Sequence, residues 1–254
     1  RLAPGAVYPG GDEPHYLVVT QSLLYDGDLR IANNHEQGDY RPYYPGSLRP
    51  HYRTLGSDGE IYSIHPVGLP VLAVPAFAAG GYRGVVWLVI LLAAGTAALL
   101  WRWAFALTGS LPAATFAWAA VGLSAPFVFS SGTVYPEIPA GFCVMVAAGL
   151  LGPVRADAGR VAGVRLWLAG LAVAALPWLS TKYAGMALVL AAALALRERA
   201  RPRRAASIVL PLAVSLAGWF TFFYAYWGSP LPSAPYGDDT QMSVRTLLSG
   251  GPGN

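Results

Sequence analysis

The residues best suited to chemistry stand near the start of the chain, in the stretch "GDEPHYL". Asp12 and Glu13 are adjacent carboxylates, and His15 follows two positions later. Carboxylates and imidazoles are the side chains that most often exchange protons with a reacting group. The stretch also has a structural interpretation, because Asp12 is a favourable helix N-cap and Pro14 suits a first helical turn. A capping role and a catalytic role do not exclude one another.

Three further ionisable residues adjoin long apolar runs. His65 lies in "YSIHPVGLPVL", Glu137 in "TVYPEIP" and Lys182 in "STKYA". Ionisable groups at membrane-embedded positions are costly, and they mark functional sites by default. Simpler interpretations exist for each. Glu137 and Lys182 could pair with one another or extend to lipid headgroups, and His65, like His15, is more typical of a hydrogen-bonding residue than of a metal ligand.

The composition sets the environment of these residues. Of 254 residues, 55% are hydrophobic and 12% are charged, roughly half the charged fraction of a soluble domain. Residues 84–101 and 205–227 carry no charge, and residues 103–154 carry only Glu137. About 20 consecutive apolar residues span a bilayer core. The sequence therefore predicts an integral membrane protein, an all-α polytopic bundle of spanning helices.

Six spanning helices are expected. The fourth and fifth share one apolar stretch, residues 166–196, which contains only Pro177 and Lys182 as interruptions. A single helix of that length would extend about 46 Å, well beyond a hydrocarbon core of about 30 Å. We therefore expect a tight hairpin at "PWLSTKY". The predicted spans are residues 84–107, 112–130, 136–152, 164–180, 183–198 and 205–227.

Residues 1–82 are expected to form one long loop outside the bundle. Within it, residues 14–25 have the spacing of an amphipathic surface helix, which the turn-forming pair Asp26-Gly27 ends. The apolar face of this helix consists of Tyr16, Val19, Leu23 and Leu24.

The remainder of this loop is richer in turn-forming residues. Residues 33–63 predict irregular structure with a short hairpin around 57–59, and their tyrosines also fit an interfacial aromatic belt. Residues 65–81 are apolar but contain three prolines. That pattern favours an interfacial or re-entrant segment over an ordinary spanning helix.

The basic residues set the orientation through the positive-inside rule. With six spans, the connections on one side carry nine basic and two acidic residues, against eight basic and eleven acidic residues on the other. The first side is therefore cytoplasmic, and residues 1–82 and 228–254 lie outside, flanking a bundle at 83–227. Topology and anionic headgroups account for the pI near 9.3, so nucleic acid is not an expected partner. The chain ends lead us to expect a fragment that lacks an upstream helix and a downstream region.

Several motifs then resemble a known family. In order, they are "GDEPHYL", "YSIHPVGLPVL", "YPEIPA", "LPWLSTKYA" and "YWGSPLPSAPYG". They resemble the bacterial GT-C glycosyltransferases, multipass enzymes related to protein O-mannosyltransferases and to the aminoarabinose transferases of lipid A. The resemblance covers nearly the whole chain, as an N-terminal catalytic half without its first helix. The Asp-Glu pair is its most specific element, and the family's C-terminal soluble domain has no counterpart here.

The resemblance implies transfer of a sugar from a polyprenyl-phosphate-linked donor, outside the cytoplasm and with inversion at the anomeric carbon. The acceptor would be a hydroxyl of a lipid, a glycan or a protein at the outer face of the cytoplasmic membrane. Asp12 corresponds to the general base, since the acceptor hydroxyl must lose its proton as it attacks. Glu13 would orient the acceptor or tune Asp12, because two adjacent carboxylates disfavour double ionisation.

The leaving lipid phosphate needs a cation, and Lys182 suits that role with Arg53 or Arg83 assisting. His65 would bind the same phosphate or the sugar. Glu137 would act as a sugar ligand or as part of a divalent-cation site, and such a cation is the only cofactor considered. The sugar or cation site would also include His15, Tyr62, Tyr135 and Tyr183. The proline-broken segment 65–81 would shape the path of the lipid tail.

Two other classes of protein compete with this interpretation. A transporter or lipid flippase also breaks helices with proline, but it tends to place its site near the membrane midplane and to contain internal repeats. A sensor or scaffold with an external loop would leave the acidic pair without a chemical role. The discriminating feature is spatial, because a transferase requires Asp12, Glu137 and Lys182 to share one outward-facing site.

Overall fold

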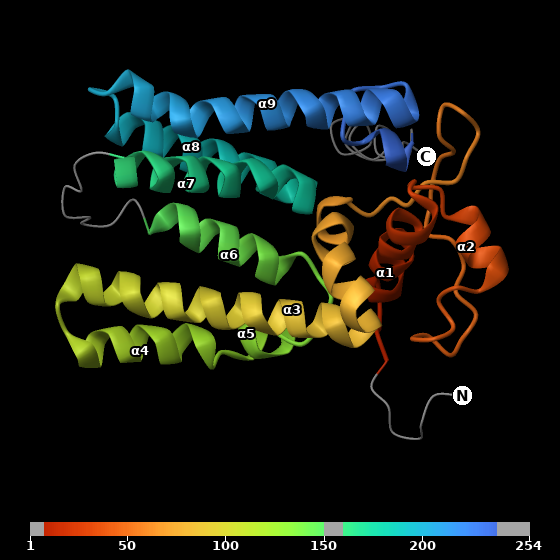
Figure 1. The fold of residues 1–254 in the computed structure, drawn as a ribbon, viewed down its shortest axis with the longest axis horizontal. Coiled ribbons are helices and arrows are strands. Elements are labelled where there is room, and N and C mark those ends of the chain that lie inside the picture. The colour runs from red at the N-terminus through yellow and green to blue at the C-terminus, as the bar shows by residue number, and fades with distance from the viewer. Residues whose placement is uncertain (1–7, 150–159, 238–254) are drawn as a thin grey trace, which may run out of the picture.

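The computed structural model describes residues 8–149 and 160–237, and regular structure within them is helical apart from one antiparallel bridge between Arg30 and Tyr62. Figure 1 shows two regions. Long helices run side by side as a helical bundle (residues 68–227), and residues 8–67 form a polar cap over one end of it. The elements are α1 (Glu13–Gln21), a π-helical turn η1 (Ser22–Asp26), α2 (Ala32–Gln37), α3 (Gly68–Thr108), α4 (Leu111–Gly122), α5 (Ala125–Ser130), α6 (Glu137–Ala148), α7 (Arg160–Leu179), η2 (Thr181–Tyr183), α8 (Ala184–Arg197), α9 (Pro202–Trp227) and η3 (Ala234–Tyr236).

The bundle confirms the prediction of an all-α architecture, but not six full-length spans. Among the described helices, α3 and α9 are long and apolar enough to cross a membrane, and α4, α6 and α7 are shorter apolar helices. α7 packs against α6, α8 and α9, and α3 packs against α4 and α6. Large apolar side chains face outward along these helices, among them Trp87, Phe116, Phe129, Val189 and Val214.

The start of α3 covers most of residues 65–81, for which the sequence predicts an interfacial or re-entrant segment. The chain is helical from Gly68 onward, because Pro70 lies in the first turn, where its missing N–H costs little, and Pro75 is accommodated inside the helix. The break comes at Gly80 and Gly81, whose backbone is not helical; Gly81 has φ 57° and ψ −146°, a region open to glycine. Figure 1 shows the first part of α3 turned away from the direction of the rest.

The span predicted at residues 112–130 is also divided. α4 ends at Gly122, and Ser124 is extended with ψ 144° before α5 begins. Pro126 explains the break, since proline fits the first turn of a helix but disrupts its interior. The predicted hairpin at "PWLSTKY" is confirmed. Ser180 is extended and the short turn η2 joins α7 to α8.

The helix predicted at the surface of the long loop is instead buried. All residues of α1 except His15 are buried, including Pro14, Thr20 and Gln21, so the helix is enclosed on nearly every side. The predicted end is confirmed, because Gly27 adopts a left-handed conformation with φ 75° directly after the helical turn η1.

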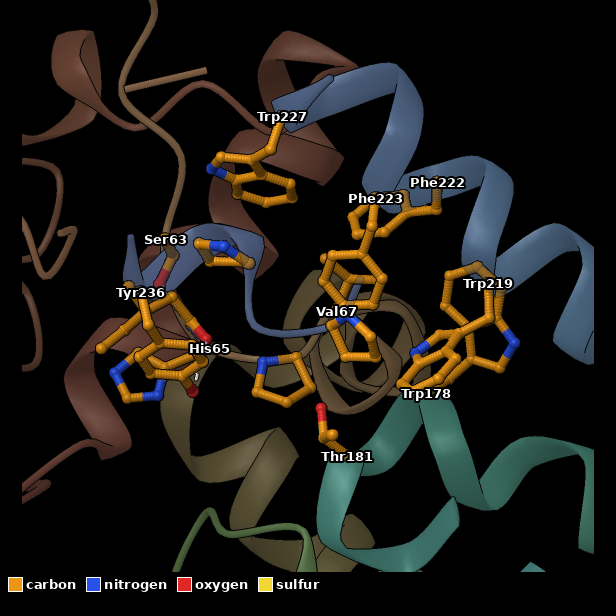
Figure 2. A pocket seen from close by; sticks show the side chains of 14 residues that line it. Ser63, His65, Val67, Trp178, Thr181, Trp219, Phe222, Phe223, Trp227 and Tyr236 are labelled. Atoms are coloured by element: carbon orange, nitrogen blue, oxygen red, sulfur yellow. Dashed lines mark hydrogen bonds between the residues drawn. The ribbon is translucent and has the colours of Figure 1, made fainter. Parts of the chain in front are cut away.

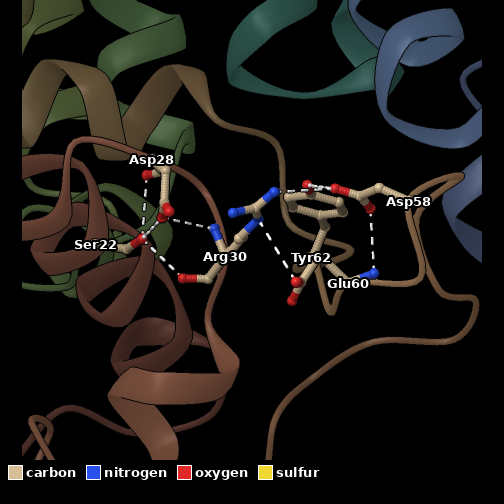
Figure 3. A network of polar contacts seen from close by, with 6 residues as sticks. All are labelled: Ser22, Asp28, Arg30, Asp58, Glu60 and Tyr62. Atoms are coloured by element: carbon tan, nitrogen blue, oxygen red, sulfur yellow. Dashed lines mark hydrogen bonds and ion pairs between the residues drawn. The ribbon is translucent and has the colours of Figure 1, made fainter.

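The hairpin expected around residues 57–59 is a turn without paired strands in the described chain. Gly59 N–H donates to the carbonyl of Gly56, and the Tyr62 hydroxyl donates to Asp58 at 2.7 Å. Figure 3 shows that Asp58 and Glu60 also face the guanidinium of Arg30, at 3.4 and 3.9 Å. A backbone hydrogen bond from Gly56 N–H to the carbonyl of Glu60, at 2.8 Å, closes this loop together with these side-chain contacts. The predicted outer loop at 228–254 is described only as far as residue 237, and Arg155 and Asp157 also lie outside the described residues.

Candidate functional site

Asp12 stands directly before α1, but its carboxylate does not cap the helix. The residue has φ −87° and ψ −7°, and no hydrogen bond from its side chain closes the first turn. Asp12 therefore occupies the predicted N-cap position, but its side chain makes no capping hydrogen bond. The backbone N–H of Asp12 donates to the hydroxyl of Tyr135 at 3.0 Å, and that hydroxyl donates to the carbonyl of Gly10 at 3.2 Å. These contacts fix the backbone and leave the carboxylate 48% exposed.

Glu13 has the opposite environment. It is buried, and its carboxylate accepts hydrogen bonds from the backbone N–H groups of Val134 at 2.6 Å and Gly10 at 2.8 Å. Both oxygens are therefore engaged by the main chain. This contact joins the polar cap to the connection between α5 and α6. It is a structural position, unlike the acceptor-orienting position expected from the sequence.

The other three histidines of the chain gather around His15. The ring of His15 lies 4.9 Å from that of His51, 5.6 Å from that of His65 and 6.4 Å from that of His35. Burial and, to a smaller extent, the neighbouring histidines together lower the pKa of His15 to about 4, against the opposing charge of Asp12. Burial lowers the pKa of His65 to about 4 in the same way. The rings of His15 and His65 are therefore neutral at pH 7.

Two of these histidines were missed from the sequence. His51 and His35 lie in the segment assigned to irregular structure, where no periodicity singles them out. One signal was present, because the four histidines of the 254-residue chain all fall between positions 15 and 65.

Lys182 and Glu137 form the ion pair that was one of their two structural interpretations. The ammonium lies 2.7 Å from Glu137 Oε1 and 5.1 Å from the centre of the Tyr183 ring. The hydrogen bond that Lys182 donates to Glu137 raises the pKa of the lysine, so it stays charged. Both side chains remain accessible, 58% and 43% exposed. The pair lies between the start of α6 and the turn η2, at the capped end of the bundle.

The charges of Asp12 and Glu137 both act on Tyr16 and Tyr135. Burial raises the pKa of Tyr16, and the charges of Glu137 and Asp12 raise it further. Tyr135 responds to the same two carboxylates after its own burial. Tyr135 holds the backbone of Asp12 and stands two residues before Glu137, so Asp12 and the Glu137–Lys182 pair lie at the same end of the bundle.

Tyr62 and Arg83 have other surroundings, and Arg53 is a surface residue. The Tyr62 ring is buried against Tyr226 and Trp227, and its hydroxyl donates to Asp58, so it presents no free face to a sugar. Arg53 is exposed. Arg83 lines a separate cavity of about 630 Å³ at the kink of α3, together with aromatic residues Tyr8, Tyr43, Phe77, Tyr82 and Trp87.

A small apolar cavity adjoins His65, as Figure 2 shows. Its volume of about 30 Å³ holds a single water molecule rather than a sugar. Its walls come from residues 63–67, the end of α7, α9 and residues 232–236, with Ser63, His65 and Thr181 as polar neighbours. The aromatic members are Trp178, Trp219, Phe222, Phe223, Trp227 and Tyr236.

Comparisons with known proteins find no matching family model, no matching curated protein and no matching solved structure. The arrangement of this chain's own residues therefore carries the function proposed below. Its central feature is an accessible carboxylate, Asp12, on a backbone held by Tyr135, with the Glu137–Lys182 pair at the same end of the bundle.

Proposed function

We propose that the protein is a membrane-embedded glycosyltransferase that moves a sugar from a polyprenyl-phosphate-linked donor to a hydroxyl acceptor. The observation that carries the proposal is the contrast between Asp12 and Glu13. The carboxylate of Glu13 accepts two backbone hydrogen bonds. The carboxylate of Asp12 is half-exposed and makes no hydrogen bond to the helix that it precedes. Glu13 therefore has a structural role, and the carboxylate of Asp12 is left accessible.

Asp12 is the general base in this proposal. As the acceptor oxygen attacks the anomeric carbon, its proton passes to the Asp12 carboxylate. The bond between that carbon and the phosphate oxygen breaks, and the lipid phosphate leaves with the bonding electrons. Asp12 then returns the proton to solvent.

Lys182 supplies the cation for the leaving phosphate. It stands at the turn before α8, so the amino end of a 14-residue helix adds its partial positive charge at the same place. Its present partner, Glu137, is an exposed carboxylate, and exposed ion pairs contribute only about 0–1 kcal/mol. A phosphate can therefore compete for the lysine at small cost.

A membrane setting is supported by the outer surface of the bundle. Only 22% of the most apolar stretch of α3 and 33% of that of α9 is buried. The core helices of a soluble protein are mostly buried. We propose the six-span arrangement in the cytoplasmic membrane, with α4 and α5 together forming the second span. The arginines near the start of α9 lie at the end opposite the polar cap, which supports an extracytoplasmic cap.

The decisive experiment is sugar transfer from a labelled polyprenyl-phosphate donor by the purified protein in detergent or vesicles. Asp12→Asn should reduce turnover by about 10²–10⁴-fold, the usual contribution of a positioned base. Binding of the donor should be retained. Glu36→Gln is the matched control, because Glu36 is an exposed carboxylate of the same cap on α2. Full activity of Asp12→Asn would rule out the proposed base.

The same assay separates a transferase from a transporter or flippase. A transporter would move the labelled lipid between leaflets without forming a glycosylated product. The charged groups discussed above lie at one end of the bundle rather than at its middle, which favours the transferase.

A further inference from the structure

The side chains of Asp12, His51 and His65 converge with their ligand atoms on one point. His51 Nδ1 lies 2.9 Å from His65 Nε2, and Asp12 Oδ1 lies 3.8 Å from the first nitrogen and 3.9 Å from the second. The two longer separations exceed the reach of a hydrogen bond. Hydrogen bonding therefore explains the contact between the rings but not the position of the carboxylate.

The same three distances fit a metal ion. The circumradius of a triangle with sides 2.9, 3.8 and 3.9 Å is about 2.1 Å, so one point lies at that distance from all three atoms. Zinc binds imidazole nitrogen at about 2.0–2.1 Å and carboxylate oxygen at about 2.0–2.2 Å. That point lies in the plane of the three atoms, whereas tetrahedral ligands at this bond length stand about 3.4 Å apart. Movements of about 0.5 Å, which separate the two rings and bring the carboxylate closer, would complete a tetrahedral site.

Each ligand is held by contacts of its backbone. Ile64 N–H donates to the carbonyl of His51 at 3.1 Å, which ties the segments of the two histidines together. His65 N–H donates to Ser63 Oγ at 3.2 Å, and the N–H of Asp12 is held by Tyr135. A site built in this way loses little conformational entropy when a ligand binds.

The surroundings also suit a bound ion. The side chain of His65 is only 7% exposed, whereas those of His51 and Asp12 are 36% and 48% exposed, so one side of the triad faces solvent. His15, whose ring lies beside those of His51 and His65, has a buried Nδ1 without a hydrogen-bond partner. A water on the ion is the kind of group that an unpartnered imidazole nitrogen would accept from or donate to.

We infer that Asp12, His51 and His65 form a binding site for a divalent transition-metal ion of the zinc class. Two imidazoles with one carboxylate favour zinc and its neighbours over magnesium or calcium, which prefer sites made of oxygen ligands. Three protein ligands leave a fourth position for water or another oxygen. Ligation through Oδ1 of Asp12 leaves the second oxygen of that carboxylate unused. The inference concerns ion binding alone and does not rest on the proposed function.

The test is metal binding by the full chain in detergent, first stripped with a chelator. Titration with Co²⁺ should give one equivalent and the intense visible absorption of a tetrahedral site, and Zn²⁺ should displace it while Mg²⁺ should not. His51→Ala and His65→Ala should each weaken binding by at least about 100-fold, beyond the 10–100-fold typical of groups that only orient ligands. Asp12→Asn, at a half-exposed position, is the variant least able to disturb folding, and it should also weaken binding.

His35→Ala is the matched control. His35 belongs to the same histidine group, but its Nδ1 is bonded to the carbonyl of Leu48 and it is not part of the triad. It should retain one equivalent of Co²⁺ with the same spectrum. Absence of a tetrahedral spectrum in the unaltered protein would overturn the inference, and so would binding by His51→Ala and Asp12→Asn as tight as that of the unaltered protein. Neither outcome would affect sugar transfer by a metal-free enzyme, so the two proposals fail separately.

Discussion

The polar cap and the helical bundle both bury apolar side chains, but they differ in the polar groups that they enclose. Of the nine buried polar or charged residues in the described chain, seven lie in the cap and only Thr96 and Ser207 lie in the bundle. The bundle exposes large apolar groups instead, such as Phe116 and Phe129. A buried polar group must find a partner, whereas an apolar face needs only a close-packed neighbour. The cap is therefore specified by particular partners and the bundle by shape.

The contacts of the two regions follow this difference. In the cap, the Tyr43 hydroxyl donates to Gln21 at 2.6 Å, and Gln21 donates in turn to the carbonyl of Asp39. In the bundle, close approach depends on small residues. A Cβ on Gly170 of α7 would lie 2.5 Å from the carbonyl oxygen of Ser207 on α9. Directional bonds hold a chemical site more narrowly than packing does, and the candidate site lies in the cap.

Removal of the Glu13 carboxylate should cause the largest loss of stability in the cap. Glu13→Ala leaves the buried N–H of Val134 without a partner and also removes the hydrogen bond to Gly10. Hydrogen bonds to a charged group contribute about 1.5–3 kcal/mol each, so the loss should be about 3–5 kcal/mol. Thermal unfolding in detergent would measure it. Asp12→Ala is the control and should change stability by less than about 0.5 kcal/mol. Equal effects of the two substitutions would contradict the contrast between these neighbours.

Acid should loosen the cap before the bundle. Burial lowers the pKa of His15 and His65 from 6.5 to about 4. An unfolded chain therefore binds more protons than the folded one between these values, and stability is full above pH 6.5 and falls as the pH drops toward 4. His51, His35 and Asp12 face the same group, and only the Asp12 charge opposes the shift. Each pKa unit corresponds to about 1.4 kcal/mol, so the loss is on the order of a few kcal/mol.

Measurement of unfolding against pH, with a chelator present, checks this prediction. His15→Phe should flatten the dependence, because it removes one of the two buried imidazoles. The bundle holds no histidine, so its helicity should persist over the same range. A cap whose stability is constant from pH 7 to pH 4.5 would show that these rings protonate without cost.

A substitution that disturbs close packing in the bundle should have the next largest effect on stability. Gly170→Ala would force its new methyl group against the Ser207 carbonyl and the Cα of Ile208. Overpacking of this kind costs about 1–3 kcal/mol. Gly185→Ala on α8 is the matched control, since no atom lies within 4 Å of the added carbon, and alanine favours a helix by about 1 kcal/mol over glycine. The first should lower the melting temperature and the second should raise it. A rise in both would mean that α7 and α9 are not in close contact.

The same difference explains what could be predicted from the sequence. Bundle helices follow from local apolar patterns, so the all-α fold and the hairpin at Ser180 were predictable. Their exact breaks were not, because Pro75 interrupts no helix whereas Pro126 begins one. The position of Pro126 in the first turn of α5 is known only once the end of α4 is known.

The candidate site was predictable only in part, for the same reason. The arginines placed Asp12, Glu137 and Lys182 at one end of the bundle, which requires no knowledge of contacts. The contact between Glu13 and Val134 joins residues 121 positions apart, and no local pattern indicates it. His51 likewise gains meaning only through its distances to Asp12 and His65. Contacts between residues far apart in sequence determine the structure of the cap, and such contacts could not be predicted from local sequence patterns.

The smallest effect on stability should come from the Glu137–Lys182 pair, which lies where the two regions meet. Both side chains are about half-exposed, so Lys182→Met should change the free energy of unfolding by only about 0.2–1 kcal/mol. Its effect on the reaction should be much larger, because a leaving phosphate would lose its cation. We expect at least about a 10-fold fall in kcat/KM with a polyprenyl-phosphate donor, while Lys182→Arg, which keeps the charge, should restore part of it. Glu137→Gln should leave Lys182 free of its partner and so tighten binding of a phosphate. If Lys182→Met and Glu137→Gln weaken donor binding equally, the pair acts as one structural unit, and the phosphate must find its cation elsewhere in the cap.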